Sequence, residues 1–169
     1  MEIVKTDLVV REAIEEDKRD IWIWWNNPLT RQMMKDNDVV PWDKHSMWFD
    51  NMLNDKQRIM CVGLYNEKKI GNIRFDNMLE DNGVFDVSIN LNPIFRGQGV
   101  GALFLSETID FLLNIRKPKK LFAIMKKTNI ASRRIFEKSG FVVKEPIVSY
   151  DRMAGRYDFI TENYCELLK

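Results

Sequence analysis

The sequence predicts a mixed α/β fold in a single domain that spans residues 1–169. Stretches with strand-type patterns alternate with stretches of helical periodicity along the chain. Turn-forming residues separate them, as at 66–68 and 81–83. Hydrophobic residues make up 45% of the chain, which suits one compact core, and no repeat or linker divides the sequence.

The N-terminal half predicts a short strand, three helices and three strands. Ile14 and Ile21 lie at helical spacing, and the following Asn26-Asn27-Pro28 run ends that helix. The turn at 66–68 joins two strands as a hairpin. The expected ranges are strand Leu8–Glu12, helices Ala13–Trp25, Leu29–Lys35 and Pro41–Asn54, and strands Arg58–Tyr65, Lys69–Phe75 and Val84–Asn92.

The C-terminal half begins where Pro93 ends the last of these strands, because proline has no backbone donor for the sheet. A glycine-rich loop and a strongly amphipathic helix follow. Thr128 can cap the next helix, and Gly140 fits the position just after it. The expected ranges are helix Val100–Ile115, strand Lys120–Met125, helix Asn129–Ser139, and strands Phe141–Lys144 and Tyr157–Leu168.

Composition argues against several classes of protein. No stretch of eighteen apolar residues could span a membrane, and the first residues lack the apolar region of a signal peptide. A cytoplasmic protein is therefore expected, with Cys61 and Cys165 as free thiols. One histidine and two scattered cysteines do not form the usual zinc sites, so no metal is expected.

Charge is distributed unevenly along the chain. Residues 96–138 carry ten Lys or Arg against three acids, a net charge of +7, so the remainder carries −6 because the whole chain is +1. A basic segment in an otherwise acidic domain indicates a local polyanion site. Nucleic acid is not an expected partner, because such a surface is usually broader and raises the pI above the 7.7 found here.

The loop Arg96-Gly97-Gln98-Gly99-Val100-Gly101 lies between a strand and a helix. Its glycines let the backbone approach a ligand, and the helix start presents N–H groups that have no partner within the helix. Together these features predict a phosphate site. The spacing differs from the G-x-G-x-x-G dinucleotide fingerprint, and the G-K-[ST] of a P-loop is absent.

The segment Leu91–Gly101 resembles the acyl-coenzyme A signature of the GNAT family of N-acetyltransferases, (R/Q)-x-x-G-x-(G/A) after a bulged strand. Asn129–Phe141 resembles the family's second signature, and Val9–Ala13 matches its usual opening. The resemblance implies a central, mostly antiparallel, twisted sheet of six to seven strands, splayed at the acetyl-CoA site and flanked by about four helices. It also implies acetyl-CoA as the acetyl donor and a primary amine as the acceptor.

The resemblance assigns cofactor contacts by position. Backbone groups near Leu91 would pair with the pantetheine amides, as an added strand pairs with a sheet edge. N–H groups of the glycine loop would hold the pyrophosphate, and basic residues in 116–134 would meet the 3′-phosphate. The implied cofactor-binding residues are Leu91, Asn92, Arg96, Gly97, Gln98, Gly99, Val100, Gly101, Asn129, Ser132 and Phe136.

Amide formation needs a neutral amine and a polarised thioester carbonyl. The family resemblance makes a backbone N–H near Leu91 the oxyanion donor and Asp86 the candidate base. His45 is the rival base, because histidine titrates near neutral pH. Many family members have a tyrosine as general acid where this chain has Phe136, which cannot donate a proton. Either the thiolate leaves without direct protonation, or water, Ser132 or Ser139 substitutes for the tyrosine.

All five tryptophans fall between residues 22 and 48. This region resembles, more loosely, acetyltransferases that act on nucleotide-linked amino sugars, with Arg31 available for phosphates and Trp48 for stacking. The implied acceptor-binding residues are Trp25, Asn27, Arg31, His45 and Trp48. Protein N-termini and polyamines are alternative acceptors, and a non-catalytic acetyl-CoA-binding domain is the alternative class. The sequence leaves open whether the protein is a monomer or a homodimer.

Overall fold

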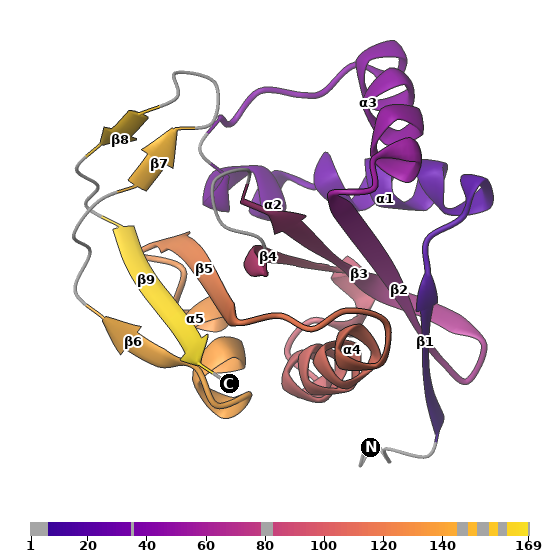
Figure 1. The fold of residues 1–169 in the computed structure, drawn as a ribbon. Coiled ribbons are helices and arrows are strands. Elements are labelled where there is room, and N and C mark those ends of the chain that lie inside the picture. Colours follow the sequence, from indigo (N-terminus) through magenta and orange to yellow (C-terminus); the bar gives the residue numbers. More distant parts are fainter. Residues whose placement is uncertain are drawn as a thin grey trace.

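A computed structural model gives the fold, and it describes residues 7–34, 36–78, 83–144, 149–151, 156–158 and 162–168. Helices and strands alternate in an order that matches the expected one closely (Figure 1). The α-helices are α1 (Lys18–Trp25), α2 (Pro28–Met33), α3 (Trp42–Asn54), α4 (Val100–Ile115) and α5 (Ile130–Lys138). The strands are β1 (Leu8–Glu12), β2 (Arg58–Tyr65), β3 (Lys68–Asn77), β4 (Val84–Leu91), β5 (Lys120–Lys126), β6 (Val142–Lys144), β7 (Ser149–Asp151), β8 (Arg156–Asp158) and β9 (Glu162–Leu168).

Two predicted elements differ from the observed ones. The first helix begins at Lys18 rather than Ala13, because Glu15–Asp17 form a separate 3-10 turn, η2. The single strand predicted over Tyr157–Leu168 is wrong. β8 pairs with β7 in a small sheet of its own, whereas β9 pairs with β5 and β6 in the main sheet. Their partners lie elsewhere in the chain, which a local pattern does not reveal.

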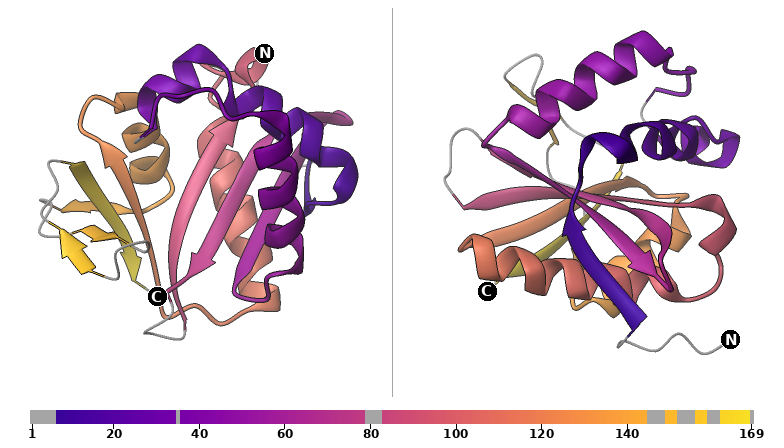
Figure 2. Two further views of the ribbon diagram at one scale, coloured as in Figure 1. Left: turned by 90° about the horizontal axis from the view of Figure 1, so that it is seen from above. Right: turned by 90° about the vertical axis from the view of Figure 1, so that its right-hand side faces the viewer.

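The main sheet contains seven strands in the order β1-β2-β3-β4-β5-β9-β6. Its neighbouring strands are antiparallel except for β4 and β5, which run parallel, so the predicted mixed fold with a mostly antiparallel sheet is confirmed. The parallel pair is short, running only from Val84 opposite Lys120 to Asp86 opposite Phe122. Beyond Asp86 the two strands open into a V (Figure 2, left).

Helices cover the sheet on both faces, with α1 to α3 on one side and α4 and α5 on the other (Figures 1 and 2). The larger apolar core lies under α4, where Phe104 and Leu105 are fully buried against side chains of β2 to β5. A smaller core joins α1 and α3 to β2 through Ile21, Phe49 and Val62. The sheet is thus a middle layer, and its two faces have different neighbours.

Cys61 is a buried free thiol on β2, as expected. Burial raises the pKa of this thiol to about 12, so it stays protonated and unreactive at neutral pH. The side chain of Cys165 lies outside the described residues. Among the described residues, no helix is long and apolar enough to cross a membrane.

The Asp17 side chain connects the 3-10 turn η2 to strands β1 and β3 of the sheet. Its carboxylate is fully buried, and it accepts hydrogen bonds from both terminal nitrogens of Arg11 (2.6 and 2.9 Å) and from the Ile14 N–H (2.9 Å). Lys69 Nζ on β3 lies 2.7 Å away. Burial alone would raise the pKa of Asp17, but these contacts outweigh it and hold the pKa below its ordinary value.

Replacing Asp17 with asparagine leaves Arg11 and Lys69 without their shared anion. We expect the free energy of unfolding at pH 7 to fall by about 3 kcal/mol, the size typical of a broken buried ion pair. The folded-state pKa is depressed, so the carboxylate's contribution is present above the unfolded pKa and is lost as pH falls through the folded one. Urea unfolding should therefore show that the difference in unfolding free energy between wild type and Asp17→Asn disappears below about pH 4. Asp20→Asn, at the exposed partner of Lys69, is the control and should have a much smaller effect.

Candidate active site

The glycine loop forms an open turn at the start of α4. Gly97 and Gly99 have φ of 75° and 80°, a left-handed conformation that side chains rarely adopt. A Cβ built on either glycine would meet no heavy atom within 4 Å, so the loop is uncovered on that side. Gly99 is the N-cap residue of α4, and the first-turn N–H groups lack intrahelical partners. The turn therefore has the form of an anion site.

Gly101 has a packing role that the signature does not reveal. A Cβ there would lie 2.6 Å from Ile135 Cδ1 on α5 and 3.2 Å from Leu91 Cδ1. The residue is buried, and its lack of a side chain lets α4 and α5 approach each other. Packing between the two helices accounts for the absence of a side chain at this position, and the backbone N–H contact with a phosphate stays a prediction.

The end of β4 presents backbone groups to the gap between β4 and β5. The Asn92 N–H donates to the Ile70 carbonyl (2.9 Å), which places the β3-facing groups on even-numbered residues. The backbone groups of Ile89 and Leu91 consequently point to the other edge, where β5 has diverged. An extended molecule lying in the gap could pair with them as an added strand does.

Arg96 braces this end of β4 against α2. Its guanidinium donates to the Leu91 carbonyl from Nε (3.2 Å) and Nη2 (3.0 Å). The same group donates to Asn27 Oδ1 (3.1 Å) and to the Thr30 hydroxyl. Burial lowers the pKa of Arg96 from its usual value, although the group stays protonated at neutral pH. The Arg96 side chain is thus a structural contact, and its backbone N–H also donates within the loop, to the Pro93 carbonyl (3.3 Å).

Several other signature residues use their side chains to bond to the backbone of the loops and helix ends. Asn92 Oδ1 accepts from the Ile94 N–H (3.3 Å), and its Nδ2 donates to the Lys69 carbonyl (2.9 Å). Asn129 Oδ1 caps α5 by accepting from the Ser132 N–H (3.1 Å). Gln98 Nε2 donates to the Ile94 carbonyl (2.6 Å). These contacts shape the loops, and they were not evident from the motif.

Phe136 is 1% exposed and packs edge-on against Phe141, with ring centroids 4.9 Å apart. Its ring belongs to the core under α4, so the position given to it as a cofactor contact is corrected to a packing position. The Ser139 hydroxyl donates to the Ala102 carbonyl (3.1 Å). Of the two serines considered as substitutes for the missing tyrosine hydroxyl, Ser139 is therefore already engaged.

The face of the sheet under α1 carries a row of polar side chains. Asp86, Ser88 and Asn90 lie on this face, because Val87, Ile89 and Leu91 pack toward the core under α4. On β3, Asp76, Arg74 and Asn72 stand directly opposite them. The β3 residues were missed from the sequence, although polar residues at every second position of a buried strand are a usable signal. We call these six residues the polar face.

Aromatic side chains border the polar face from α1 and α3. The Arg74 guanidinium lies over the Trp48 ring, 5.4 Å from its centroid, and Arg74 Nε donates to Asp76 Oδ2 (2.9 Å). Trp25 packs against Trp48 with centroids 6.2 Å apart. Both tryptophans are half-buried, so each keeps accessible ring surface. The structure thus brings together Trp25, Trp48 and the polar face.

Comparison with known proteins identifies the type of site. Residues 7–142 match the model of the family described as acetyltransferase (GNAT) domain. The chain belongs to this family. It is accordingly an N-acetyltransferase that uses acetyl-CoA. No curated protein sequence matches the chain.

Solved GNAT-type structures share its fold at low sequence identity. Spermidine N-acetyltransferase from Vibrio cholerae, solved with CoA and spermine, has a TM-score of 0.80 at 18% identity over 96% of each chain. A ribosomal L7/L12 alpha-N-protein acetyltransferase with CoA has 0.76 at 14%, covering 99% of this chain and 96% of its own. An aminoglycoside acetyltransferase with coenzyme A has 0.75 at 16%, covering 96% and 95%.

His45 does not occupy the position expected of a base in this acetyltransferase. It is 3% exposed, its Nε2 lies 3.0 Å from the Lys18 carbonyl, and its ring packs among Trp42, Trp48 and Phe49. Burial lowers the pKa of His45, which keeps the ring neutral. Its Nε2–H donates to that carbonyl, which joins α3 to α1. Its side chain is therefore placed neither to act as the base nor to bind the acceptor.

The side chains of Arg31 and Asn27 also form hydrogen bonds within the protein rather than lying free for an acceptor. Arg31 donates to the carbonyls of Asn26 (3.2 Å) and Asn37 (2.6 Å), which fixes the chain after α2. Asn27 Oδ1 caps α2 through the Leu29 N–H (3.2 Å) and accepts from Arg96. The predicted pairing of Arg31 with nucleotide phosphates therefore has no support in the structure.

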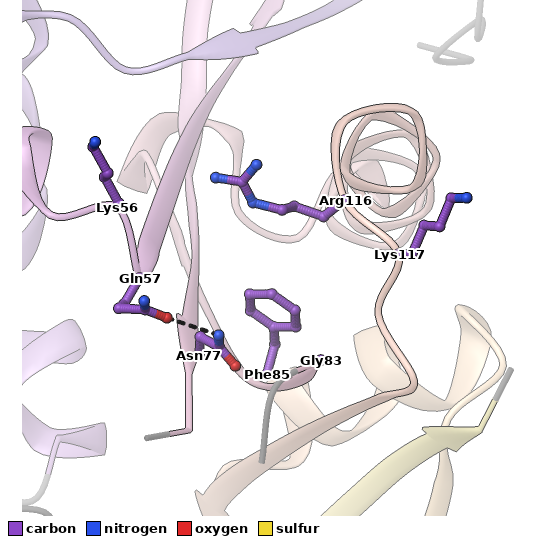
Figure 3. Close-up of a pocket in the computed structure, with 7 residues that line it drawn as sticks. All are labelled: Lys56, Gln57, Asn77, Gly83, Phe85, Arg116 and Lys117. Atoms are coloured by element: carbon purple, nitrogen blue, oxygen red, sulfur yellow. Dashed lines mark hydrogen bonds between the residues drawn. The ribbon is translucent and has the colours of Figure 1, made fainter. Parts of the chain in front are cut away.

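A pocket lies at the other end of the acetyltransferase sheet, where β4 begins (Figure 3). Asn77 and Gln57 share a hydrogen bond in its wall (2.8 Å), and Arg116 and Lys117 point in opposite directions from the end of α4. Lys56, Gly83 and Phe85 complete the lining. The glycine loop follows the far end of β4, so this pocket is separate from the transfer site.

Gly101→Ala tests the packing role assigned to that glycine. The added methyl group would meet Ile135, so we expect a lower melting temperature, equivalent to about 1–3 kcal/mol of overpacking. A second change, Ile135→Ala, removes the obstructing atoms and should restore part of the loss. Gly97→Ala, which meets open space, should instead weaken acetyl-CoA binding through backbone strain. Equal stability of Gly101→Ala and wild type would contradict the assignment.

Proposed function

We propose that the enzyme acetylates a small primary amine that enters from the polar face, and that amino sugars are the first acceptors to test. The single observation that carries this proposal is the polar face itself, beside the gap in which Ile89 and Leu91 present backbone groups. Trp48 and Trp25 offer ring surface on which a sugar ring can stack. A nucleotide-linked amino sugar is less favoured than a free one. Arg31, the residue expected to contact the nucleotide phosphates, is bound to backbone carbonyls.

The transfer step needs few groups from the protein. The neutral amine nitrogen attacks the thioester carbonyl carbon, a C–N bond forms, and the C–S bond breaks. The N–H of Leu91 or Ile89 would stabilise the oxyanion in between. The amine proton passes to a base, and the CoA thiolate leaves and takes a proton from water. Phe136 takes no part in this proton transfer.

Asp86 is the proposed base, acting through a relay. With a rise of about 3.3 Å per residue, Asp86 lies about 10 Å along β4 from Ile89 and about 17 Å from Leu91. Direct contact with an amine that attacks a carbonyl at Leu91 is therefore out of reach. Ser88 lies between them on the same face, and one or two water molecules could complete a path.

A polyamine acceptor is the second candidate, favoured by Asp76 standing directly opposite Asp86. Two facing acids suit a polycation, because like charges opposite each other in a sheet repel unless a cation lies between them. Asp76, however, is already held by Arg74 Nε (2.9 Å) and Arg58 Nε (3.4 Å). These two cations weaken the case for a polyamine.

Thiol release from acetyl-CoA measures the reaction for any amine. We expect turnover with 2-amino sugars, weaker turnover with spermidine, and none without an amine. Turnover only with peptides bearing a free N-terminus would refute the sugar proposal. Tight CoA binding with no thiol release for any amine would support a non-catalytic domain instead.

Asp86→Asn tests the base. We expect kcat at pH 7 to fall by about 10- to 100-fold with little change in the KM for acetyl-CoA. This is at or below the lower limit of direct general-base effects, because a relay intervenes. Asp110→Asn, an exposed acid on α4 across the sheet, is the matched control and should leave kcat unchanged. An unchanged kcat in Asp86→Asn would remove Asp86 from the mechanism.

A further inference from the structure

Two buried asparagines on the polar face have side-chain atoms that no other group satisfies. Asn72 on β3 is 5% exposed and Asn90 on β4 is 6% exposed. Neither Asn72 Oδ1 nor Asn90 Nδ2 has a hydrogen-bond partner. A buried amide group without a partner is unfavourable, and native proteins seldom retain one without a reason.

The two side chains lie beside each other. Asn72 stands directly opposite Asn90 in the sheet. The Asn92 N–H bond to the Ile70 carbonyl sets the alternation, so the backbones of Asn72 and Asn90 bond to each other and only their side chains lack partners. Their Cα atoms are then about 5.5 Å apart. The unsatisfied acceptor of Asn72 and the unsatisfied donor of Asn90 therefore belong to directly paired residues on the same face of the sheet, and they do not bond to each other.

The pair of asparagines lies beside the proposed transfer site. Asn90 is flanked in β4 by Ile89 and Leu91, whose backbone groups point into the gap between β4 and β5. Arg96 fixes the Leu91 carbonyl to the start of α2, which holds this end of β4 in place. The two asparagine side chains lie on the opposite side of the strand from the core under α4, which is the side that we assign to the acceptor.

We propose that Asn72 and Asn90 select an acceptor that carries an oxygen on the carbon next to its amine. Asn72 Oδ1 accepts an N–H of the amine, and Asn90 Nδ2 donates to the neighbouring hydroxyl or carbonyl oxygen. The proposal rests on the proposed acetylation of a small amine and narrows its substrate class. The two asparagines are positioning residues, because the bonds that form and break are those of the amine and the thioester.

The same pair disfavours polyamines. A polyamine offers N–H groups to Asn72 but has no oxygen for Asn90, so the buried donor stays unsatisfied. Arg74, which lies beside Asn72 on β3 and opposite Ser88, adds a cation next to the pair. A site built to hydrogen-bond an oxygen discriminates against the analogue that lacks it.

Matched amines test the selection. The substrates are 2-aminocyclohexanol and cyclohexylamine, which differ only in the neighbouring hydroxyl, with spermidine as a third. Thiol release gives kcat/KM for each. In the wild-type enzyme we expect the amino alcohol to exceed cyclohexylamine by about tenfold or more, the size of one good hydrogen bond.

Asn90→Leu removes the donor with little change in volume. We expect its kcat/KM for the amino alcohol to fall by about tenfold, to the level of cyclohexylamine, which itself should change by less than about twofold. Asn72→Leu should lower kcat/KM for both amines. Asn114→Leu, the same change at an exposed position of α4 across the sheet, is the matched control and should keep the wild-type ratio. The melting temperature of Asn90→Leu should equal or exceed that of wild type, because an apolar group replaces an unsatisfied polar one.

The outcomes separate the two claims. If no amine causes thiol release from acetyl-CoA, the proposed acetylation is wrong, and the proposed selection by Asn72 and Asn90 is wrong as well. If both cyclic amines react equally in wild type, or if Asn90→Leu keeps the preference for the amino alcohol, the selection is wrong and the proposed function stands. A less stable Asn90→Leu with unchanged selectivity would mean that water, rather than the acceptor, satisfies the pair, and the selection would be wrong.

Discussion

The proposed active site depends on the parting of β4 from β5. The two strands pair from Val84 to Asp86 only, and each residue of β4 beyond that point keeps a partner on β3 but none on β5 among the described strands. Backbone N–H and C=O groups away from water need hydrogen-bond partners. The gap therefore exposes obligatory donors and acceptors at a fixed spacing, which suits the amide groups of an extended pantetheine arm.

Arg96 holds the end of β4 in place beside that gap. Its guanidinium takes up the Leu91 carbonyl and links it to Asn27 and Thr30, so the end of β4 and the start of α2 are fixed to each other. The glycine turn follows directly and leads into α4. One side chain thus connects the cofactor loop to the helices that border the acceptor, which explains why an arginine suits the first position of the signature here.

The sequence predicted local features well and distant contacts poorly. Gly97 and Gly99 have the left-handed φ that their pattern indicates, and α4 begins where predicted. The bonds from Arg96 to Asn27 and Thr30 join residues 69 and 66 positions apart, and no local pattern contains them. His45 was a plausible base from its intrinsic pKa alone, but burial between α1 and α3 decides its role. The same limit applies to Arg31, whose partners come from the folded path of the chain.

Under the proposed function, the polar face keeps unsatisfied amide groups buried for recognition of the acceptor. Replacing such groups with apolar ones commonly increases stability and decreases function.

Amide hydrogen exchange at the end of β4 tests the central claim most directly. The backbone N–H groups of Ile89 and Leu91 point into the gap, whereas the backbone N–H of Asn90 already bonds to β3. Acetyl-CoA should slow exchange at Ile89 or Leu91 and leave Asn90 nearly unchanged. Unchanged exchange at both Ile89 and Leu91 with saturating acetyl-CoA would contradict the placement of the cofactor in the gap.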